Sequence, residues 1–255
     1  MRNKWVFIVL WLAFTSFIIE NLHNNDVQRQ WQTTNKQRQR TSSTQRMEQQ
    51  GMVDIRSLDK TIRVSLMYSR SNNFTGEVLY TDLTKAYLHP LAAHALVKAQ
   101  AKLKELRPDL SLIIFDATRP MSVQQTMWNT VKNTSHRFYV SNPANGGGMH
   151  NYGMAVDISI CKASWNEKLW CDGAIPCKID TIPMGVKVDH LGNESHIDNE
   201  QQLLTRGVLT KESLENRRLL RRVMKAAGFQ PLRTEWWHFN LCTRKWAKAH
   251  LEVIK

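Results

Sequence analysis

The sequence predicts an α+β fold: a single domain with a central antiparallel sheet that carries the functional site, preceded by an N-terminal signal or anchor and a flexible tether. Three observations predict it. Segments with helical and with strand periodicity are mixed along the chain without strict alternation. No internal repeat is evident. At 255 residues and 42% hydrophobic content, the chain is long enough for one good-sized domain with a real core.

The N-terminus resembles an export signal. Residues 1–4 are short and basic, and residues 5–19 form an apolar run interrupted only by Thr15 and Ser16. That length suits a signal peptide better than a full membrane span of about 20 residues. No Ala-x-Ala cleavage site and no cysteine for lipidation follow. Residues 1–23 are therefore expected to be a cleaved signal or an uncleaved membrane anchor, with the rest of the chain in the periplasm or facing it.

Residues 24–51 are rich in Gln, Asn, Thr, Ser and Arg, with almost no aliphatic side chains. Such a segment buries too little apolar area to order itself, so a flexible tether is expected there and the folded domain over 52–255. The net charge of +13 gives information about what the protein meets in its surroundings, and none about its fold. No nucleic-acid-binding motif is present, and anionic envelope polymers or phospholipid surfaces suit this charge at least as well.

Three helices are expected in the domain. Residues 91–106 follow Pro90, which suits a first helical turn. Residues 120–132 have helical character. A third helix should run to Ala227, capped by Thr210 and stopped by Gly228.

Three strands are also expected. Residues 111–115 are a short apolar run ending at Asp116. Residues 154–160 alternate, which places Ala155 and Asp157 on one side and the larger apolar side chains on the other. Residues 229–240 should return as a strand.

Two distant segments carry the chemistry. His150 precedes Asp157 by seven residues, and Glu235 precedes His238 by three. Each residue alone has an ordinary structural explanation; in particular, a carboxylate in an apolar strand such as Asp157 is usually salt-bridged. Together they offer two imidazoles and a carboxylate, which is the three-ligand set of a catalytic Zn²⁺ with an open fourth position.

Glu235 is then left as a carboxylate beside the site. In a regular strand Glu235 and His238 would face opposite sides, so a shared role requires a bend or an irregular backbone between them. With that bend, Glu235 can act as general base and acid for a water that zinc activates.

The chain resembles the zinc D-Ala-D-Ala peptidases (peptidase family M15), and more closely the D-alanyl-D-alanine dipeptidases of the VanX type. The resemblance covers nearly all of residues 53–242. Seven ordered blocks carry it: Tyr68-x4-Asn73-Phe-Thr-Gly76, Phe115-Asp-Ala-Thr-Arg-Pro120, His150-x-x-Gly-x-Ala-x-Asp157, Pro183-Met-Gly-x-x-x-Asp189, Ser195-His196, Asn216-Arg-Arg218 and Gly228-Phe-x5-Glu-Trp-Trp-His238.

The resemblance implies a role for each matching residue. His150, Asp157 and His238 would hold one Zn²⁺, and Glu235 would be the general base and acid. Arg119 would stabilise the oxyanion, for which its fixed fork of donors suits it. The pocket residues would be Tyr68, Asp189 as partner of the substrate's ammonium group, and His196, while Asp116 would orient the metal ligands.

The implied activity is zinc-dependent hydrolysis of D-alanyl-D-alanine to two D-alanines, in cell-wall dipeptide turnover or glycopeptide resistance. A peptidoglycan DD-carboxypeptidase or endopeptidase is the alternative, and a non-catalytic envelope-binding module is a further one. The chain departs from the family at Gly148, where serine is usual, so a hydroxyl contact to the substrate is in question.

The four cysteines lie in the part expected to be exported, where disulfides can form. The segment 161–180, which carries three of them, is longer than in compact family members. A disulfide-tied insertion near the site is therefore expected, with a connectivity that the sequence does not fix. The cysteines are Cys161, Cys171, Cys177 and Cys242.

Overall fold

The computed structural model describes residues 42–164 and 180–255. The expected signal or anchor at residues 1–23 and the tether up to residue 41 lie outside the described residues. Within the described part of the chain, no helix has the length and apolar character needed to cross a membrane.

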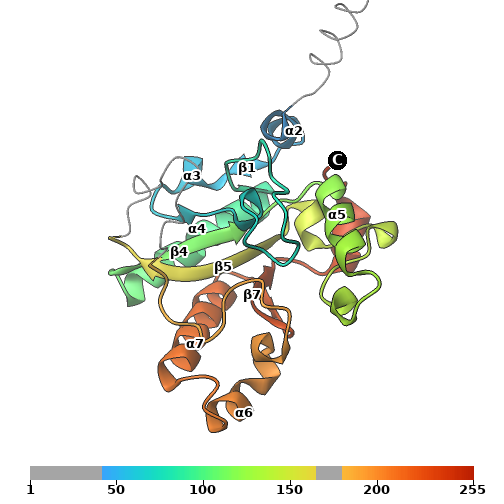
Figure 1. The fold of residues 1–255 in the computed structure, drawn as a ribbon. Helices are drawn as coiled ribbons and strands as arrows, with labels where there is room; N and C mark the ends of the chain where they lie inside the picture. Colours follow the sequence, from blue (N-terminus) through green and yellow to red (C-terminus); the bar gives the residue numbers. More distant parts are fainter. Residues whose placement is uncertain (1–41, 165–179) are drawn as a thin grey trace, which may run out of the picture. The chain divides into compact units, whose positions relative to one another are not determined.

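A five-stranded sheet forms the centre of the domain, in the order β2-β4-β5-β7-β6. Strand β5 runs through the middle, with β4 and β7 on either side (Figure 1). The strands are β2 (Arg63–Val64), β4 (Leu110–Asp116), β5 (Ala155–Lys162), β7 (Glu235–Asn240) and β6 (Gln230–Leu232).

The central pairs β4–β5, β5–β7 and β7–β6 are antiparallel, as expected, but β2 pairs with β4 in parallel. The prediction of a purely antiparallel sheet is therefore wrong at this edge, and the sheet is mixed. The chain between β2 and β4 passes through helix α4 (Pro90–Leu106), and such a crossover is what a parallel pair requires.

The expected helices are confirmed within a residue or two at each end. Besides α4, they are α5 (Met121–Val131) and α7 (Lys211–Ala226). Thr210 caps α7 by accepting a hydrogen bond from the backbone N–H of Ser213, at 3.0 Å. The expected strand over 229–240 is instead the hairpin β6–β7, because the chain turns at residues 233–234.

Shorter elements complete the fold. A second, two-stranded sheet pairs β1 (Val53–Asp54) with β3 (Tyr87–Leu88). The short α-helices are α2 (Ser43–Gln49), α3 (Ile55–Leu58), α6 (Glu200–Thr205) and α8 (Arg244–His250). The 3-10 helices are η1 (Met67–Ser69), η2 (Ser135–Phe138), η3 (Pro143–Asn145), η4 (Met149–Tyr152), η6 (Asn193–Ser195) and η7 (Ile197–Asn199).

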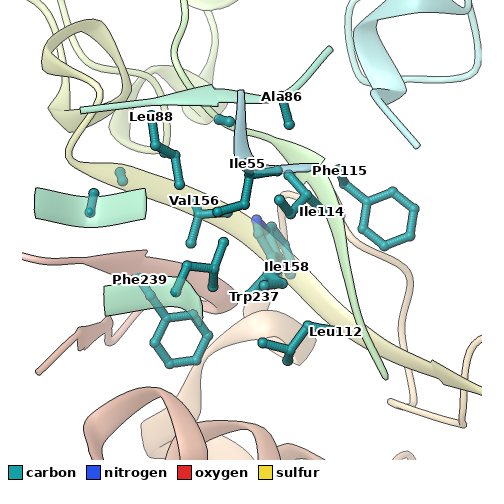
Figure 2. Close-up of a cluster of buried hydrophobic side chains, with 14 of the residues drawn as sticks. Ile55, Ala86, Leu88, Leu112, Ile114, Phe115, Val156, Ile158, Trp237 and Phe239 are labelled. Carbon is teal, nitrogen blue, oxygen red and sulfur yellow. The ribbon is translucent and has the colours of Figure 1, made fainter. Parts of the chain in front are cut away.

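The core lies against both faces of the central strands, so β4 and β5 are buried along almost their whole length. Figure 2 shows part of it, where Leu112, Ile114, Val156, Ile158 and Phe239 from β4, β5 and β7 gather in one cluster. These positions alternate along their strands with those that carry the site. The apolar alternation of the sequence therefore directs Asp157 to the opposite face of β5.

The domain begins earlier than the sequence predicts. Helix α2 lies in the segment expected to be tether, and its Met47 is fully buried in the core. The backbone N–H of Ser43 donates to Asp82 Oδ2 at 2.8 Å, which fixes the start of the helix. One buried methionine in a polar stretch gives no periodic signal, which is why composition alone misplaced the boundary.

The described cysteines do not support the expected disulfide framework. Cys161 is a buried free thiol on β5, and Cys242 is a half-buried free thiol after β7. Cys171 and Cys177 lie outside the described residues.

Replacing Met47 by Ala should lower the free energy of unfolding by about 2–4 kcal/mol, because a fully buried Met leaves a cavity that the surrounding core fills only in part. Denaturant unfolding of the folded domain measures it. The exposed Gln49→Ala in the same helix is the matched control and should change stability by less than about 0.5 kcal/mol. If the two variants are equally stable, residues 43–51 do not pack on the domain and belong to the tether.

Candidate metal centre

Three side chains from different parts of the chain meet beside the central sheet. Asp157 lies in β5, and the antiparallel register places it directly opposite His238 of β7. His150 lies in η4, the short turn that leads into β5. All three are buried, and together they form a group able to hold a metal ion. The structure thus brings together the three ligands that the sequence predicts.

The donor atoms form a compact triangle. His150 Nε2 lies 3.2 Å from Asp157 Oδ1 and 3.2 Å from His238 Nδ1. His238 Nδ1 lies 3.0 Å from Asp157 Oδ1. Donor atoms of a tetrahedral zinc site lie about 3.3 Å apart, since the bonds are about 2.0–2.1 Å long. The triangle therefore has the dimensions of one face of such a site.

The far nitrogen of each imidazole is already engaged. His150 Nδ1 donates to the Ala117 carbonyl oxygen at 2.6 Å, and His238 Nε2 donates to Asn240 Oδ1 at 2.9 Å. These bonds fix the tautomers, so two bare nitrogen lone pairs face each other beside a carboxylate. Two imidazole nitrogens and a carboxylate oxygen thus converge on one point, and the residues present therefore fit a metal ion.

Asn240 is a residue of the candidate site that the sequence did not predict. It lies two positions after His238 in β7, and alternation places both side chains on one face of the strand. That spacing was available in the sequence, but an Asn at a strand end is too common to single out.

The irregular backbone expected between Glu235 and His238 is present as a bulge. Pro231 of β6 pairs with Phe239 of β7, but the next residue of β6, Leu232, pairs with Glu235. Strand β7 therefore has extra residues between these two pairs. The extra residues of β7 bring Glu235 back to the side of His238, with Glu235 Oε2 at 3.8 Å from His238 Nδ1. Glu235 therefore stands beside the three donor atoms without joining their triangle.

The surroundings of Glu235 favour its protonated form. The pKa of this carboxyl is raised to about 7, mainly by burial; Asp157 and Asp189 add to the rise, and His238 and Arg119 oppose it. A carboxylate with a pKa near neutrality is suited to taking and returning a proton.

Arg119 is held by the end of β4. A bulge at Phe115 brings Asp116 opposite Asp157, and Asp116 Oδ2 accepts from two nitrogens of the guanidinium, Nε at 3.0 Å and Nη2. Tyr80 donates to the other oxygen of Asp116, at 2.5 Å. Asp116 thus orients Arg119, whereas the role expected for it was to orient metal ligands; its Oδ2 lies 3.7 Å from Nδ1 of His150.

Gln124 of α5 completes the support of Arg119. Its Oε1 accepts from Arg119 Nη1 at 2.9 Å, and its Nε2 donates to the Ser141 carbonyl oxygen at 2.8 Å. This buried glutamine was not predicted, because nothing in the sequence distinguishes it from the other glutamine of the helix. With these partners engaged, one N–H on each terminal nitrogen of Arg119 remains for a ligand.

Tyr68 and Asp189 form a second polar group on the other side of Arg119. Asp189 Oδ1 accepts from the Tyr68 hydroxyl at 2.9 Å, and its Oδ2 accepts from the backbone N–H of Phe74 at 2.7 Å. The Arg119 guanidinium lies over the Tyr68 ring, 5.3 Å from its centroid. Burial raises the pKa of Asp189 to about 7, although both hydrogen bonds oppose that shift.

A cavity of about 580 Å³ joins these groups. It is lined by the three donor residues together with Glu235, Arg119, Tyr68 and Asp189. His196 does not line it: its Nε2 lies 2.9 Å from the hydroxyl of Tyr139, and Tyr139 borders the cavity. A direct substrate contact for His196 therefore stays a prediction, and its observed contact is with the cavity wall.

The fold and this site define a metallopeptidase, and the comparisons with known proteins agree. The sequence profile of the peptidase M15 family, described as D-ala-D-ala dipeptidase, matches residues 48–255. The chain therefore belongs to the D-Ala-D-Ala dipeptidase family of metallopeptidases.

Curated relatives are similar over most of their length. The D-alanyl-D-alanine dipeptidase of Escherichia coli (strain K12) is 26% identical over 74% of this chain and 84% of the relative. That of Enterococcus faecalis (strain ATCC 700802 / V583) is 23% identical over 71% of this chain and 86% of the relative. The dipeptidase of Synechocystis sp. (strain ATCC 27184 / PCC 6803 / Kazusa) is 25% identical over 60% and 68%.

Replacing Asn240 by Ala should weaken metal binding by about 10–100-fold, because His238 loses the partner that fixes its tautomer and ring orientation. Chelator competition on the purified protein measures the affinity. Asn129→Ala, on the exposed face of α5, is the control and should leave it unchanged. An unaltered affinity in the Asn240 variant would mean that this hydrogen bond does not support the centre.

Proposed function

We propose that this protein is a zinc-dependent dipeptidase that hydrolyses D-alanyl-D-alanine to two D-alanines. One observation carries the proposal: the donor triangle of His150, Asp157 and His238 opens on the same cavity as Glu235 and Arg119. The family supports the dipeptide substrate. Two imidazoles and one carboxylate are a donor set that suits zinc.

When bound at this site, Zn²⁺ supplies a Lewis acid that polarises the scissile carbonyl and activates water. Glu235 takes a proton from the attacking water and delivers it to the nitrogen of the leaving D-alanine. Its pKa of about 7 lets one carboxyl perform both transfers near neutral pH.

Arg119 stabilises the negative charge that develops on the carbonyl oxygen, through the N–H groups left free by Asp116 and Gln124. Because those partners hold the guanidinium in place before substrate binds, little reorganisation is needed as the charge develops. Arg119 is buried, and the exclusion of water around it strengthens this interaction.

Asp189 binds the free ammonium group of the dipeptide, with Tyr68 holding the carboxylate in position. An enzyme that releases single residues from a dipeptide must recognise the amino end, and a buried carboxylate does so by charge. The Asp189 carboxylate favours a dipeptidase over a peptidoglycan DD-carboxypeptidase or endopeptidase, because the substrates of those enzymes have an acylated nitrogen in place of the free ammonium group.

The location of this activity forms part of the proposal. The basic and apolar N-terminus supports export, with the enzyme in the periplasm or anchored to the inner membrane and facing it. There it would act in cell-wall dipeptide turnover. D-Ala-D-Ala hydrolysis in periplasmic and membrane fractions tests the location, and activity confined to the cytoplasmic fraction would contradict it.

Replacing Glu235 by Ala should leave stoichiometric zinc in place and lower the rate of D-Ala-D-Ala hydrolysis by about 10²–10⁴-fold, since proton transfer is lost and the ligands remain. Metal analysis and steady-state kinetics on the same preparation measure both. A variant as active as the wild type would favour a non-catalytic envelope-binding module, and so would a wild-type protein with less than one metal per chain.

Free D-Ala-D-Ala should be hydrolysed much faster than N-acetyl-D-Ala-D-Ala, because acetylation removes the charge that Asp189 binds. The ratio of kcat/KM for the two substrates measures this preference. Activity on the acylated substrate alone would replace the dipeptidase by a DD-carboxypeptidase.

Binding of D-Ala-D-Ala should tighten as the pH rises from about 6 to about 7.5, because Asp189 loses its proton in that range while the dipeptide's α-amino group keeps one. Calorimetry on the Glu235→Ala protein measures this without hydrolysis and without Glu235 titrating. Asp189→Asn should bind more weakly and with little dependence on pH. Asn tolerates the positive φ of 72° at this position. An unchanged pH dependence in that variant would assign the effect to another group.

A further inference from the structure

Ser141 presents an unused hydroxyl to the cavity. The residue is half-buried and lines the cavity wall just before η3. Its carbonyl oxygen accepts from Gln124, but its Oγ has no hydrogen-bond partner in residues 42–164 or 180–255. A hydroxyl that faces a cavity in this way is available to a ligand.

Gly148 makes the room that this hydroxyl occupies. A Cβ atom placed on residue 148 would lie 2.9 Å from Ser141 Oγ and 3.2 Å from Ser141 Cβ. The backbone of Gly148 is extended, with φ of −107°, so glycine is not required there for conformation. The lack of a side chain at position 148 is therefore needed for space, because any side chain there would push the Ser141 hydroxyl away. A serine at this position could not coexist with Ser141 as it stands.

Ser141 is also tied to the oxyanion-stabilising arginine. Gln124 bridges the Ser141 carbonyl and Arg119 Nη1, and Arg119 packs over Tyr68, which holds Asp189. In this series of contacts Arg119 lies between Ser141 and Asp189. A dipeptide whose carbonyl meets Arg119 and whose ammonium meets Asp189 would extend its other end toward Ser141.

The charges near Ser141 suit that end of the dipeptide. Arg244 of α8 lines the cavity, and its Nη2 donates to the carbonyl oxygen of Asn145 at 2.9 Å, in the loop between Ser141 and Gly148. Lys248 Nζ lies 3.6 Å from the position of a Cβ on Gly146 in the same loop. Two cations beside this loop favour a carboxylate.

We propose that Ser141 is a substrate-binding residue whose hydroxyl donates a hydrogen bond to the dipeptide's carboxylate, and that Gly148 is required to admit it. The proposal rests on the dipeptidase function above and adds a specificity determinant to it. The absence of a side chain at position 148 thus leaves the Ser141 hydroxyl as the polar group that lines this part of the cavity.

Ser141→Ala should raise KM for D-Ala-D-Ala roughly 10- to 100-fold with kcat changed less than about threefold, as expected for losing a hydrogen bond to a charged group. The dissociation constant of D-Ala-D-Ala, measured by calorimetry in the Glu235→Ala background, should rise by the same factor. Ser122→Ala, exposed on α5 and outside the cavity, is the control.

The partner of the hydroxyl is identified by a substrate without the carboxylate. D-Alanyl ethylamide is D-Ala-D-Ala with that group replaced by hydrogen. Its dissociation constant should be the same for the Ser141→Ala protein and its parent. An equal loss of affinity for both ligands would overturn the carboxylate assignment.

Gly148→Ala should match Ser141→Ala, and the double variant should be no worse than either, because both changes remove one hydroxyl from one place. Exchanging the two residues, as Ser141→Gly with Gly148→Ser, should recover part of the lost affinity. Additive effects of the two single changes would show that Gly148 acts independently of Ser141. All variants are compared at equal zinc content and thermal stability, so a folding defect is recognised as such.

A wild-type protein that hydrolyses D-Ala-D-Ala, with unchanged KM in Ser141→Ala, would overturn the role of Ser141 alone. A zinc-loaded wild type without this activity would overturn the proposed function and the inference together.

Discussion

The register between β5 and β7 is the constraint on which the site depends. It sets Asp157 opposite His238, and a shift by one residue would turn one of them to the other face of the sheet. Apolar side chains on the opposite faces of the same strands lock this register, since slipping would expose Val156, Ile158 and Phe239. The hydrophobic core therefore positions the three donor side chains as well as stabilising the domain.

Some of the buried charged side chains near these strands are neutralised by a partner of opposite charge. Asp116 and Arg119 form a buried ion pair, which alone would contribute little to stability because desolvation offsets the attraction. Tyr80 donates to the other oxygen of Asp116, and Gln124 accepts from Nη1 of Arg119, so the pair is held from both sides. The result is a guanidinium fixed in direction at the wall of the cavity. Asp189 and Glu235 are not balanced in this way, and their raised pKa values reflect that cost.

Strand irregularities do the remaining positioning. The β7 bulge brings Glu235 beside the donor triangle, and the bulge at Phe115 aims Asp116 across at Arg119. Bulges re-aim side chains without breaking the core, and so they recur next to active sites. In the loop before η4, a glycine without conformational need leaves space for the hydroxyl of Ser141. The residues of the candidate site thus lie where the regular pattern of the strands is interrupted.

The sequence by itself determined the helices with clear caps, the central strands and the donor set of His150, Asp157 and His238, because periodicity, capping residues and motif spacing are local signals. It also required an irregular backbone before His238. Tertiary structure alone decided the parallel edge strand β2, the start of the domain at α2, and the contacts that Asn240, Gln124 and Ser141 make. Those features arise from contacts between residues far apart in the chain or from single side chains, and neither leaves a pattern in the sequence.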